Sequence, residues 1–333
     1  MSFLLLAVSF AVILAGALLF TNAVEWIGHR LELGEGAVGS VLAAVGTAMP
    51  ETLIAIVALI GAKEGADEVA IGAIVGAPFL LGTLAMGLVG LFAYLYRDRR
   101  STGLQLDAHG PTLERDLIFF LIFFALSLVL AWGAPEAVRY PLGVLVILAY
   151  PIYIHRTISG GGEVQDHASL NPLIFERREE YRTNPALVFC VIQLLVGLAA
   201  MVGGAHLFVE ELLHIAESLG VEPVVLALIL APLATELPEK VNSFFWVREN
   251  KDSLALGNLT GAMVFQSTIP FGIGLLFTDW ALSTNAAISV VLGLVGGFLA
   301  YEMLHRRDRF SLAAVITWFA LYIAYIGIVA IGA

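Results

Sequence analysis

The chain has 333 residues, of which 59% are hydrophobic and 14% charged, and its mean hydropathy is +0.90. A water-soluble domain could not keep so much apolar surface from solvent, so the composition predicts a protein with many membrane spans. The formal charge of −11 comes without a basic patch interleaved with aromatic residues, which gives no indication of nucleic-acid binding. The single cysteine, Cys190, excludes an internal disulfide and a cysteine-based zinc site.

Apolar runs of about 20 residues, the length that a bilayer needs, recur along the whole chain. We expect ten transmembrane helices, at residues 3–23, 36–62, 69–94, 117–132, 137–154, 185–212, 221–247, 254–277, 281–300 and 310–331. The first run has no charged n-region and no clear small-x-small cleavage site. We therefore interpret it as a membrane helix and not as a signal peptide.

The basic residues gather in alternate loops. Of the 17 Lys and Arg residues, the loops of one side hold only Lys63 and Arg139, and Lys240 lies inside an expected span. The positive-inside rule makes the other side, which carries the remainder, cytoplasmic. We therefore expect a multi-pass protein of the plasma (inner) membrane, with both termini on the extracytoplasmic side and the linker 156–184 in the cytoplasm.

An acidic phrase, GTAMPE at residues 46–51, interrupts the apolar run 36–62. A carboxylate in hydrocarbon costs at least about 2.5 to 3.5 kcal/mol, so Glu51 is a candidate functional group. The preceding Pro50 lacks an N–H and leaves backbone carbonyl oxygens free nearby. Carboxylate, hydroxyl and carbonyl oxygens gathered in a dry place suit a hard cation such as Na⁺ or Ca²⁺.

The phrase is repeated as ATELPE at residues 234–239. When the sequence is aligned with itself at an offset of 188 residues, residues 15–51 align with residues 203–239 without a gap. Each copy holds five expected spans, and an odd number means that the second copy enters the membrane upside down. Inverted repeats with interrupted helices that meet at mid-membrane are the architecture of secondary transporters. We expect an all-α membrane protein with ten transmembrane helices in two inverted five-helix repeats, at residues 1–155 and 185–333.

The two phrases resemble the Gly-Thr-Ser-x-Pro-Glu signature of the calcium/cation antiporter superfamily, the sodium/calcium exchanger type. A second family signature, Gly-Asn-x-x-Gly-Ser-Asn/Asp, is similar to GAIVGAP at 72–78 and GNLTGAM at 257–263. The resemblance covers most of the chain except the central loop. It implies a secondary active antiporter, not an enzyme, that exchanges Ca²⁺ for Na⁺ or H⁺ by alternating access at a midplane carboxylate site. It implies no cofactor, with the bilayer and inorganic cations as partners.

The chain departs from the family pattern at several positions. Pro78 and Met263 stand where the family has Asn or Asp, so two side-chain oxygens of the expected site are absent. In the second copy, Glu236 stands where a serine is usual. From the two phrases and their neighbours we expect these cation ligands: Glu51, Glu239, Thr47, Thr235, Glu236 and Asn258.

Glu236, Glu239 and Lys240 are spaced by three and four residues, which places them on one helical face. A charged cluster cannot face lipid cheaply, so it should face the partner repeat. We predict that Lys240 pairs with Glu236 and leaves Glu51 and Glu239 as paired carboxylates, for which protons, Na⁺ and Ca²⁺ compete. The alternative is a salt-bridged cluster that only fixes helix packing.

Other functions are compatible with the same residues. The carboxylates could serve an antiporter or channel for another cation, such as Mn²⁺, or Na⁺/H⁺ exchange. The Pro78 and Met263 departures leave room for a transport-inactive sensor. An intramembrane hydrolase would need Glu210, Glu211 and His214, but these lie at the outer end of a span and no second histidine cluster supplies a metal site.

Overall fold

The computed structural model describes residues 1–30, 43–61, 63–106, 110–159, 171–176, 185–307 and 309–332. Within these ranges the chain is helical apart from short turns, and it has no strand. The elements are α1 (Ser2–Arg30), α3 (Ala43–Gly61), α4 (Ala66–Leu80), the π-helix η2 (Leu81–Ala85), α5 (Met86–Leu95), α6 (Gly110–Leu130), α7 (Glu136–Ser159), α8 (Leu187–Leu219), α9 (Pro223–Arg248), α10 (Asp252–Gln266), α11 (Ile269–Phe277), α12 (Thr284–Arg307) and α13 (Leu312–Gly332).

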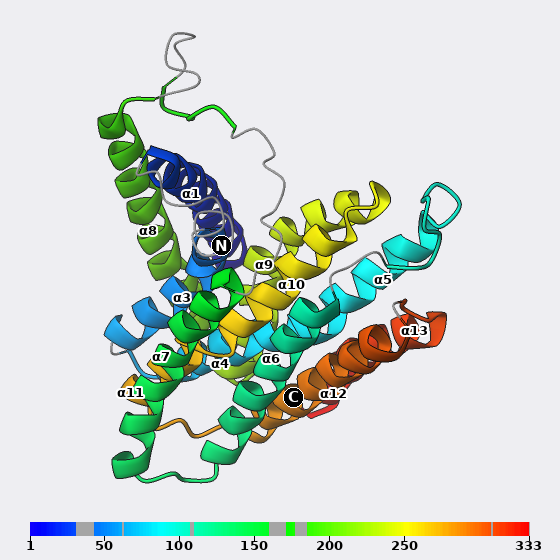
Figure 1. Ribbon diagram of the computed structural model, residues 1–333. Helices are drawn as coiled ribbons and strands as arrows, with labels where there is room; N and C mark the ends of the chain where they lie inside the picture. The colour runs from blue at the N-terminus through cyan, green and yellow to red at the C-terminus, as the bar shows by residue number, and fades with distance from the viewer. Residues whose placement is uncertain are drawn as a thin grey trace.

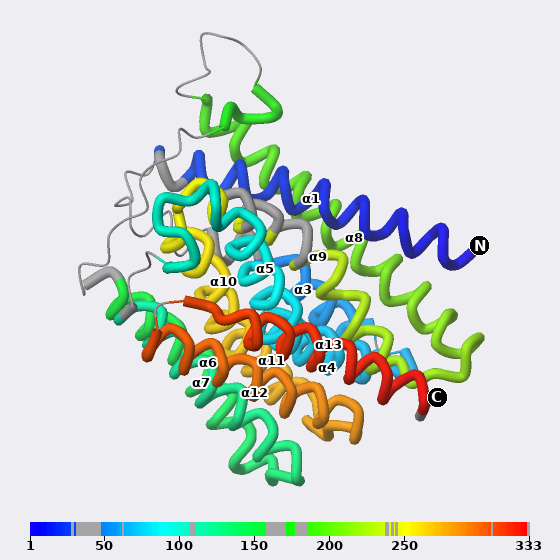
Figure 2. The backbone as a smooth tube through the Cα atoms, turned by 90° about the vertical axis from the view of Figure 1, so that its right-hand side faces the viewer, coloured from blue at the N-terminus to red at the C-terminus, as the bar shows by residue number. Residues whose placement is uncertain are grey.

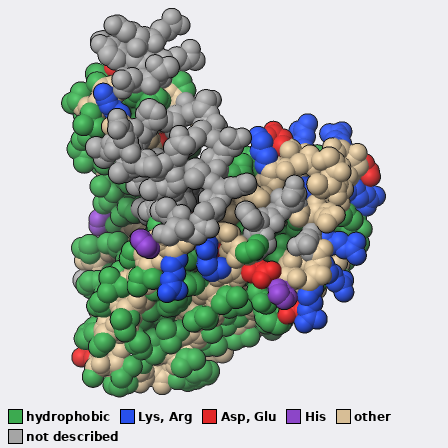
Figure 3. Space-filling view, viewed as in Figure 1, with side chains coloured by type: hydrophobic (Ala, Val, Ile, Leu, Met, Phe, Trp, Pro, Cys, Tyr) green, Lys and Arg blue, Asp and Glu red, His purple; other side chains and the backbone are tan. Residues whose placement is uncertain are grey.

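The protein is an all-helical, multi-pass membrane protein. Among the described residues, seven helical stretches are long and apolar enough to cross a bilayer, and α4, η2 and α5 together form one of them. Residues 48–61 and 223–236 form two shorter apolar helices. Figure 3 shows a mainly hydrophobic surface, with Lys and Arg gathered on the side where α5 ends and α13 begins.

Helices α1 and α8 form a long pair along one side of the molecule (Figures 1 and 2). Glycines allow their close approach, because a Cβ on either Gly16 or Gly197 would lie 2.8 Å from the carbonyl oxygen of the other. Near one end, Gln193 Nε2 donates to Asn22 Oδ1 at 2.9 Å. The rest of this pair is largely exposed and apolar, as a surface against lipid would be.

Helix α4 lies at the centre of the molecule. In the most apolar stretch of residues 66–95, 94% of the residues are buried inside the protein. Gly72 and Gly76 bring its backbone against α9, where a Cβ on Gly76 would lie 2.9 Å from both Leu228 Cα and Pro232 Cγ. The carbonyl of Leu228 is the one that Pro232, four residues later, cannot bond, because proline has no N–H. The small residues thus place α4 directly beside a proline-modified stretch of α9.

Helices α6, α7, α11, α12 and α13 cover the opposite side of this centre (Figures 1 and 2). Close-packed glycines recur here, since a Cβ on Gly82 of η2 would lie 2.8 Å from the carbonyl oxygen of Gly293 on α12. The centre formed by α3, α4, α9 and α10 is therefore enclosed by two groups of helices.

The described helices are interrupted away from the acidic phrases. Helices α3 and α9 continue through Pro50 and Pro238, since a proline removes one ladder hydrogen bond without ending a well-packed membrane helix. The irregular backbone lies instead in η2, which follows Pro78, and at Ser267–Thr268, between α10 and α11. Thr268 Oγ1 donates to the Val264 carbonyl at 2.7 Å, which satisfies a carbonyl beside that break.

Candidate functional site

Glu51 lies in the middle of α3 and points into the protein, with only 2% of the residue exposed. Neither of its carboxylate oxygens has a hydrogen-bond partner among the described residues. A buried carboxylate without partners is strongly disfavoured. It is therefore the group at the centre of the molecule that most needs a cation or a proton.

Helix α9 brings Thr235, Glu236 and Lys240 to this carboxylate. Each of them interacts electrostatically or by hydrogen bonding with Glu51. Glu236 and Lys240 are themselves only 1% exposed, and Lys240 Nζ lies 3.3 Å from Glu236 Oε2. Two carboxylates and one ammonium thus share a dry space between α3 and α9.

Gln266, the last residue of α10, completes the surroundings of Glu236. Its Nε2 donates to Glu236 Oε1 at 3.0 Å, and the side chain is fully buried. Glu236 is therefore held on one oxygen by Gln266 and on the other by Lys240. The sequence signal for Gln266 is a lone amide in an apolar run, which alone does not say which acid it meets.

Thr235 is fully buried, and its hydroxyl donates to the carbonyl of Ala231 at 2.8 Å. Threonine commonly makes this bond to its own helix in membranes. The hydroxyl oxygen keeps lone pairs for a further donor or a cation. Thr235 therefore lies in the site near Glu51, and its hydroxyl proton is donated to the Ala231 carbonyl.

Asn258 lies on α10 and donates from Nδ2 to Ser243 Oγ on α9 at 3.2 Å. Ser243 lies three residues beyond Lys240 and is fully buried. The described contact of Asn258 is thus with α9, near Lys240, and not with Glu51 or Glu236. The side chains of Thr47 and Glu239, two further expected ligands, lie outside the described residues, although α3 and α9 include their backbone.

Pro78 and Met263 are both buried, and Met263 belongs to the main hydrophobic core. Neither supplies a polar side-chain atom. Among the described side chains, the oxygens of the site therefore come from α3, from α9 and from the Gln266 amide at the end of α10. In the described part of the chain, no group of three or more His, Cys, Asp or Glu side chains is placed to hold a metal ion.

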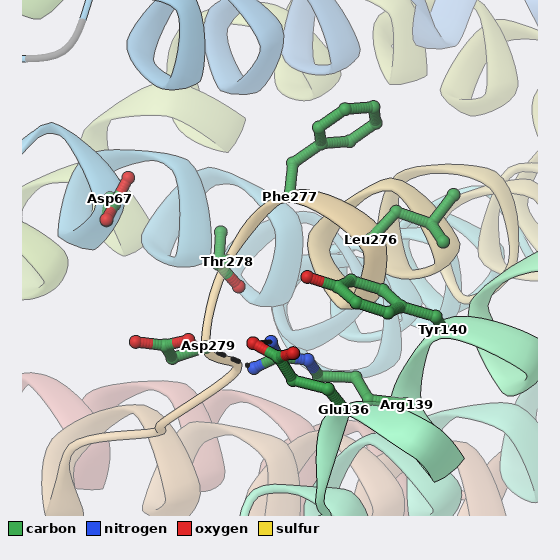
Figure 4. A pocket seen from close by; sticks show the side chains of 8 residues that line it. All are labelled: Asp67, Glu136, Arg139, Tyr140, Leu276, Phe277, Thr278 and Asp279. Atoms are coloured by element: carbon green, nitrogen blue, oxygen red, sulfur yellow. Dashed lines mark hydrogen bonds and ion pairs between the residues drawn. The ribbon is translucent and has the colours of Figure 1, made fainter.

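A separate polar cavity of about 160 Å³ lies at one end of the molecule, beside the start of α4 and of α7 (Figure 4). Its lining includes Asp67, Glu136, Arg139 and Asp279. Arg139 is nearly buried, with its Nη1 3.3 Å from Asp279 Oδ1, whereas Asp279 is 94% exposed. None of the residues around Glu51 lines this cavity.

A family profile described as sodium/calcium exchanger protein matches residues 1–158 and 189–331. A curated relative, the sodium/calcium exchanger MaX1 of Methanosarcina acetivorans, is 24% identical over 330 residues, which cover 88% of this chain and 89% of the relative. The match spans both copies of the acidic phrase. It confirms the family that the two signatures resemble.

Two solved structures share the fold. One is the crystal structure of an H⁺/Ca²⁺ exchanger, CAX, with a TM-score of 0.77 at 19% identity, covering 98% of this chain and 81% of that one. The other is the sodium-calcium exchanger NCX_Mj soaked with Na⁺ and Sr²⁺, with a TM-score of 0.61 at 21% identity, covering 98% and 99%. At these identities the likeness establishes the arrangement of helices.

Proposed function

Because this chain belongs to the sodium/calcium exchanger protein family, we propose that it is a secondary active antiporter that exchanges Ca²⁺ for Na⁺ or H⁺. Cation antiport is the activity of the family. The choice of ions is supported by the relatives, one named a sodium/calcium exchanger and another an H⁺/Ca²⁺ exchanger. The observation that carries the proposal is the buried carboxylate of Glu51, whose oxygens have no hydrogen-bond partner among the described residues.

In this proposal, Glu51 of α3 and Glu239 of α9 are the anionic ligands, and Thr47 and Thr235 add oxygens. A carboxylate that the protein leaves unpaired in a dry site must be neutralised by something that arrives from outside. Ca²⁺ prefers such oxygens, and Na⁺ or a proton can neutralise the same charge. Competition for one site is the physical basis of exchange.

The proposed architecture is ten spans in two inverted repeats, residues 1–155 and 185–333, with the 156–184 linker in the cytoplasm and both termini outside. Every expected span overlaps a described helix or a consecutive set of helices, which supports this count. The unequal distribution of Lys and Arg between alternate loops supports the orientation. Alternating access then follows as one repeat moves against the other around the shared site.

The test is ⁴⁵Ca uptake into proteoliposomes that contain the purified protein. We expect uptake only when the coupling ion, Na⁺ or H⁺, is more concentrated inside the vesicles than outside. Comparing vesicles loaded with Na⁺ and vesicles with an acidic interior identifies the coupling ion. Glu51→Gln should reduce uptake by at least about tenfold, since a barrier change of about 1.4 kcal/mol is already a factor of ten. Glu217→Gln, an exposed acid on α8, is the matched control and should transport normally. Undiminished exchange by the Glu51 variant would refute the assignment.

A second candidate function is antiport of another cation, such as Mn²⁺ or Na⁺ against H⁺. The buried Pro78 and Met263 favour it, because they offer no side-chain oxygens where the family signature has them. Ca²⁺ takes six to eight oxygen ligands, whereas an octahedral set of six is sufficient for Mn²⁺. Replacing ⁴⁵Ca by ⁵⁴Mn or ²²Na in the same vesicles separates these cases, and flux without a counter-ion gradient would indicate a channel.

A further inference from the structure

Lys240 is one of the largest fully buried side chains of the described protein. A lysine is almost never buried to this degree unless it is paired. Its Nζ lies 3.3 Å from Glu236 Oε2, yet it makes no hydrogen bond of good geometry with any described residue. The ammonium is thus held beside a carboxylate chiefly by charge, as a bound cation would be.

The two copies of the acidic phrase show that Glu236 and Lys240 form a neutral unit. At the same offset of 188 residues, they correspond to Ala48 and Thr52 of the first copy. Thr52 Oγ1 donates to the backbone carbonyl of Ala48 at 2.8 Å, and neither residue carries a charge. Residues 234–240 therefore differ from residues 46–52 by one acid and one base together, and both stretches have a net charge of −1.

Glu236 has a second partner, because Gln266 Nε2 donates to its Oε1. One oxygen of this carboxylate thus accepts a hydrogen bond and the other lies 3.3 Å from the Lys240 ammonium, whereas neither oxygen of Glu51 has a hydrogen-bond partner among the described residues. An arriving cation gains more at Glu51, because Lys240 forms its ion pair with Glu236.

We propose, on the basis of the antiport function above, that Lys240 is a resident cation that permanently neutralises Glu236. It thereby fixes the number of coupling ions exchanged for each substrate cation. Glu51 and Glu239 alone then present charge to the transported ions, a total of two negative charges that one Ca²⁺ or two monovalent cations can balance. Without the lysine charge, Glu236 adds a third negative charge to the site. Three monovalent cations balance it in one half of the cycle, whereas in the other half Ca²⁺ binds alone and leaves one charge uncompensated.

The experiment measures the coupling ratio in proteoliposomes with the membrane potential clamped by K⁺ and valinomycin. The Na⁺ or pH gradient at which net ⁴⁵Ca flux is zero gives the number of coupling ions per Ca²⁺. We expect Lys240→Gln to raise this number by one. Lys240→Arg, which keeps the charge, should retain the wild-type ratio. The double variant Glu236→Gln/Lys240→Gln should return to it, whatever its rate.

For variants that do not transport, the number of bound ions can be measured at equilibrium. If the flux assay identifies Na⁺ as the coupling ion, the number of ²²Na⁺ ions bound per purified protein at saturation should be one higher in Lys240→Gln than in wild type and unchanged in the double variant. If it identifies H⁺, the number of protons released per bound Ca²⁺ takes the place of the ²²Na⁺ count. An unchanged coupling ratio in an active Lys240→Gln variant, or an unchanged ²²Na⁺ count in an inactive one, would overturn the proposal. Absence of cation exchange by the wild type would instead overturn the proposed function, so the two failures are distinct.

Discussion

The two copies of the acidic phrase bury their charges in opposite ways. In the first copy, Glu51 is buried and its oxygens have no hydrogen-bond partner among the described residues. In the second copy, Glu236 is equally buried but is held by Lys240 and Gln266. Glu236 aligns with Ala48 and not with Glu51, so the second copy has an additional buried acid and, in Lys240, a base that pairs with it.

A second difference between the copies lies at the start of the following helix. Asp67 opens α4 and Asp252 opens α10, at equivalent positions once three residues of the first copy's loop are dropped. Asp67 is exposed at the cavity of Figure 4. Asp252 is fully buried and accepts from two nitrogens of Arg100, at 2.6 and 2.7 Å. Arg100 follows α5, so this ion pair joins the two halves of the chain.

The largest effect should come from breaking this ion pair. Asp252→Asn leaves the buried Arg100 guanidinium without its counter-charge, and losing one partner of a buried pair costs about 3 to 5 kcal/mol. We expect a large drop in the thermal unfolding temperature of the detergent-solubilised protein. Arg97→Ala removes a neighbouring arginine whose pair with Asp98 is exposed, and it should leave that temperature nearly unchanged. Equal shifts in both variants would contradict the contrast.

The next effect concerns the hydrogen bond that completes Glu236. Gln266→Leu removes the donor to Oε1, and a hydrogen bond to a charged group contributes about 1.5 to 3 kcal/mol. We expect a loss of stability of that order, read from the same unfolding transition. Gln266→Glu keeps the size but places a third acid beside Glu236, and it should be less stable than Gln266→Leu at neutral pH. The opposite order would show that the amide does not act through Glu236.

Helix packing in the first copy gives a prediction of similar or smaller size. Gly76→Ala would place a Cβ against Leu228 and Pro232 of α9, and overpacking a core costs about 1 to 3 kcal/mol. The control is Gly203→Ala, at an exposed helical position where no described atom lies within 4 Å of the added Cβ. It should be neutral or slightly stabilising, since alanine favours a helix over glycine. If Gly76→Ala does not lower the stability, α4 and α9 can move apart without a cost in free energy.

The smallest effect should come from an exposed ion pair. Lys63 Nζ lies 2.8 Å from Glu210 Oε1, but both side chains are about half exposed. Exposed pairs contribute between 0 and 1 kcal/mol, and salt screens them. Lys63→Ala should therefore shift the unfolding temperature by little, and by less at high salt. If Lys63→Ala lowers the unfolding temperature as much as Asp252→Asn does, burial does not explain the difference between the exposed and the buried ion pair.

Much of the fold was predictable from the sequence, because membrane helices follow from the length of apolar runs. The expected spans 69–94 and 254–277 both correspond to helices, but the sequence did not predict where each is irregular. Irregular backbone was expected near Pro50, whereas the described chain has it at η2 and at Ser267–Thr268. Close packing keeps a helix intact across one missing hydrogen bond, and sequence reasoning about proline alone does not include that packing.

The site was predictable only in part, for a related reason. The spacing of Glu236 and Lys240 indicates a shared helical face, and the structure places Lys240 Nζ beside the Glu236 carboxylate. The contact of Gln266 with Glu236 joins residues 30 positions apart on different helices, which no local pattern specifies. For the same reason, the sequence alone did not show that Asn258 meets Ser243.

The account is tested most directly by an experimental structure determined in saturating Ca²⁺, compared with one of the Glu51→Gln variant under the same conditions. We predict an ion within about 2.3 to 2.6 Å of a Glu51 carboxylate oxygen, the usual Ca²⁺–oxygen distance. The space between Glu236 and Lys240 should hold no ion, and the variant should hold none at residue 51. An ion coordinated by Glu236 in place of Lys240, with Glu51 left unoccupied, would contradict the account.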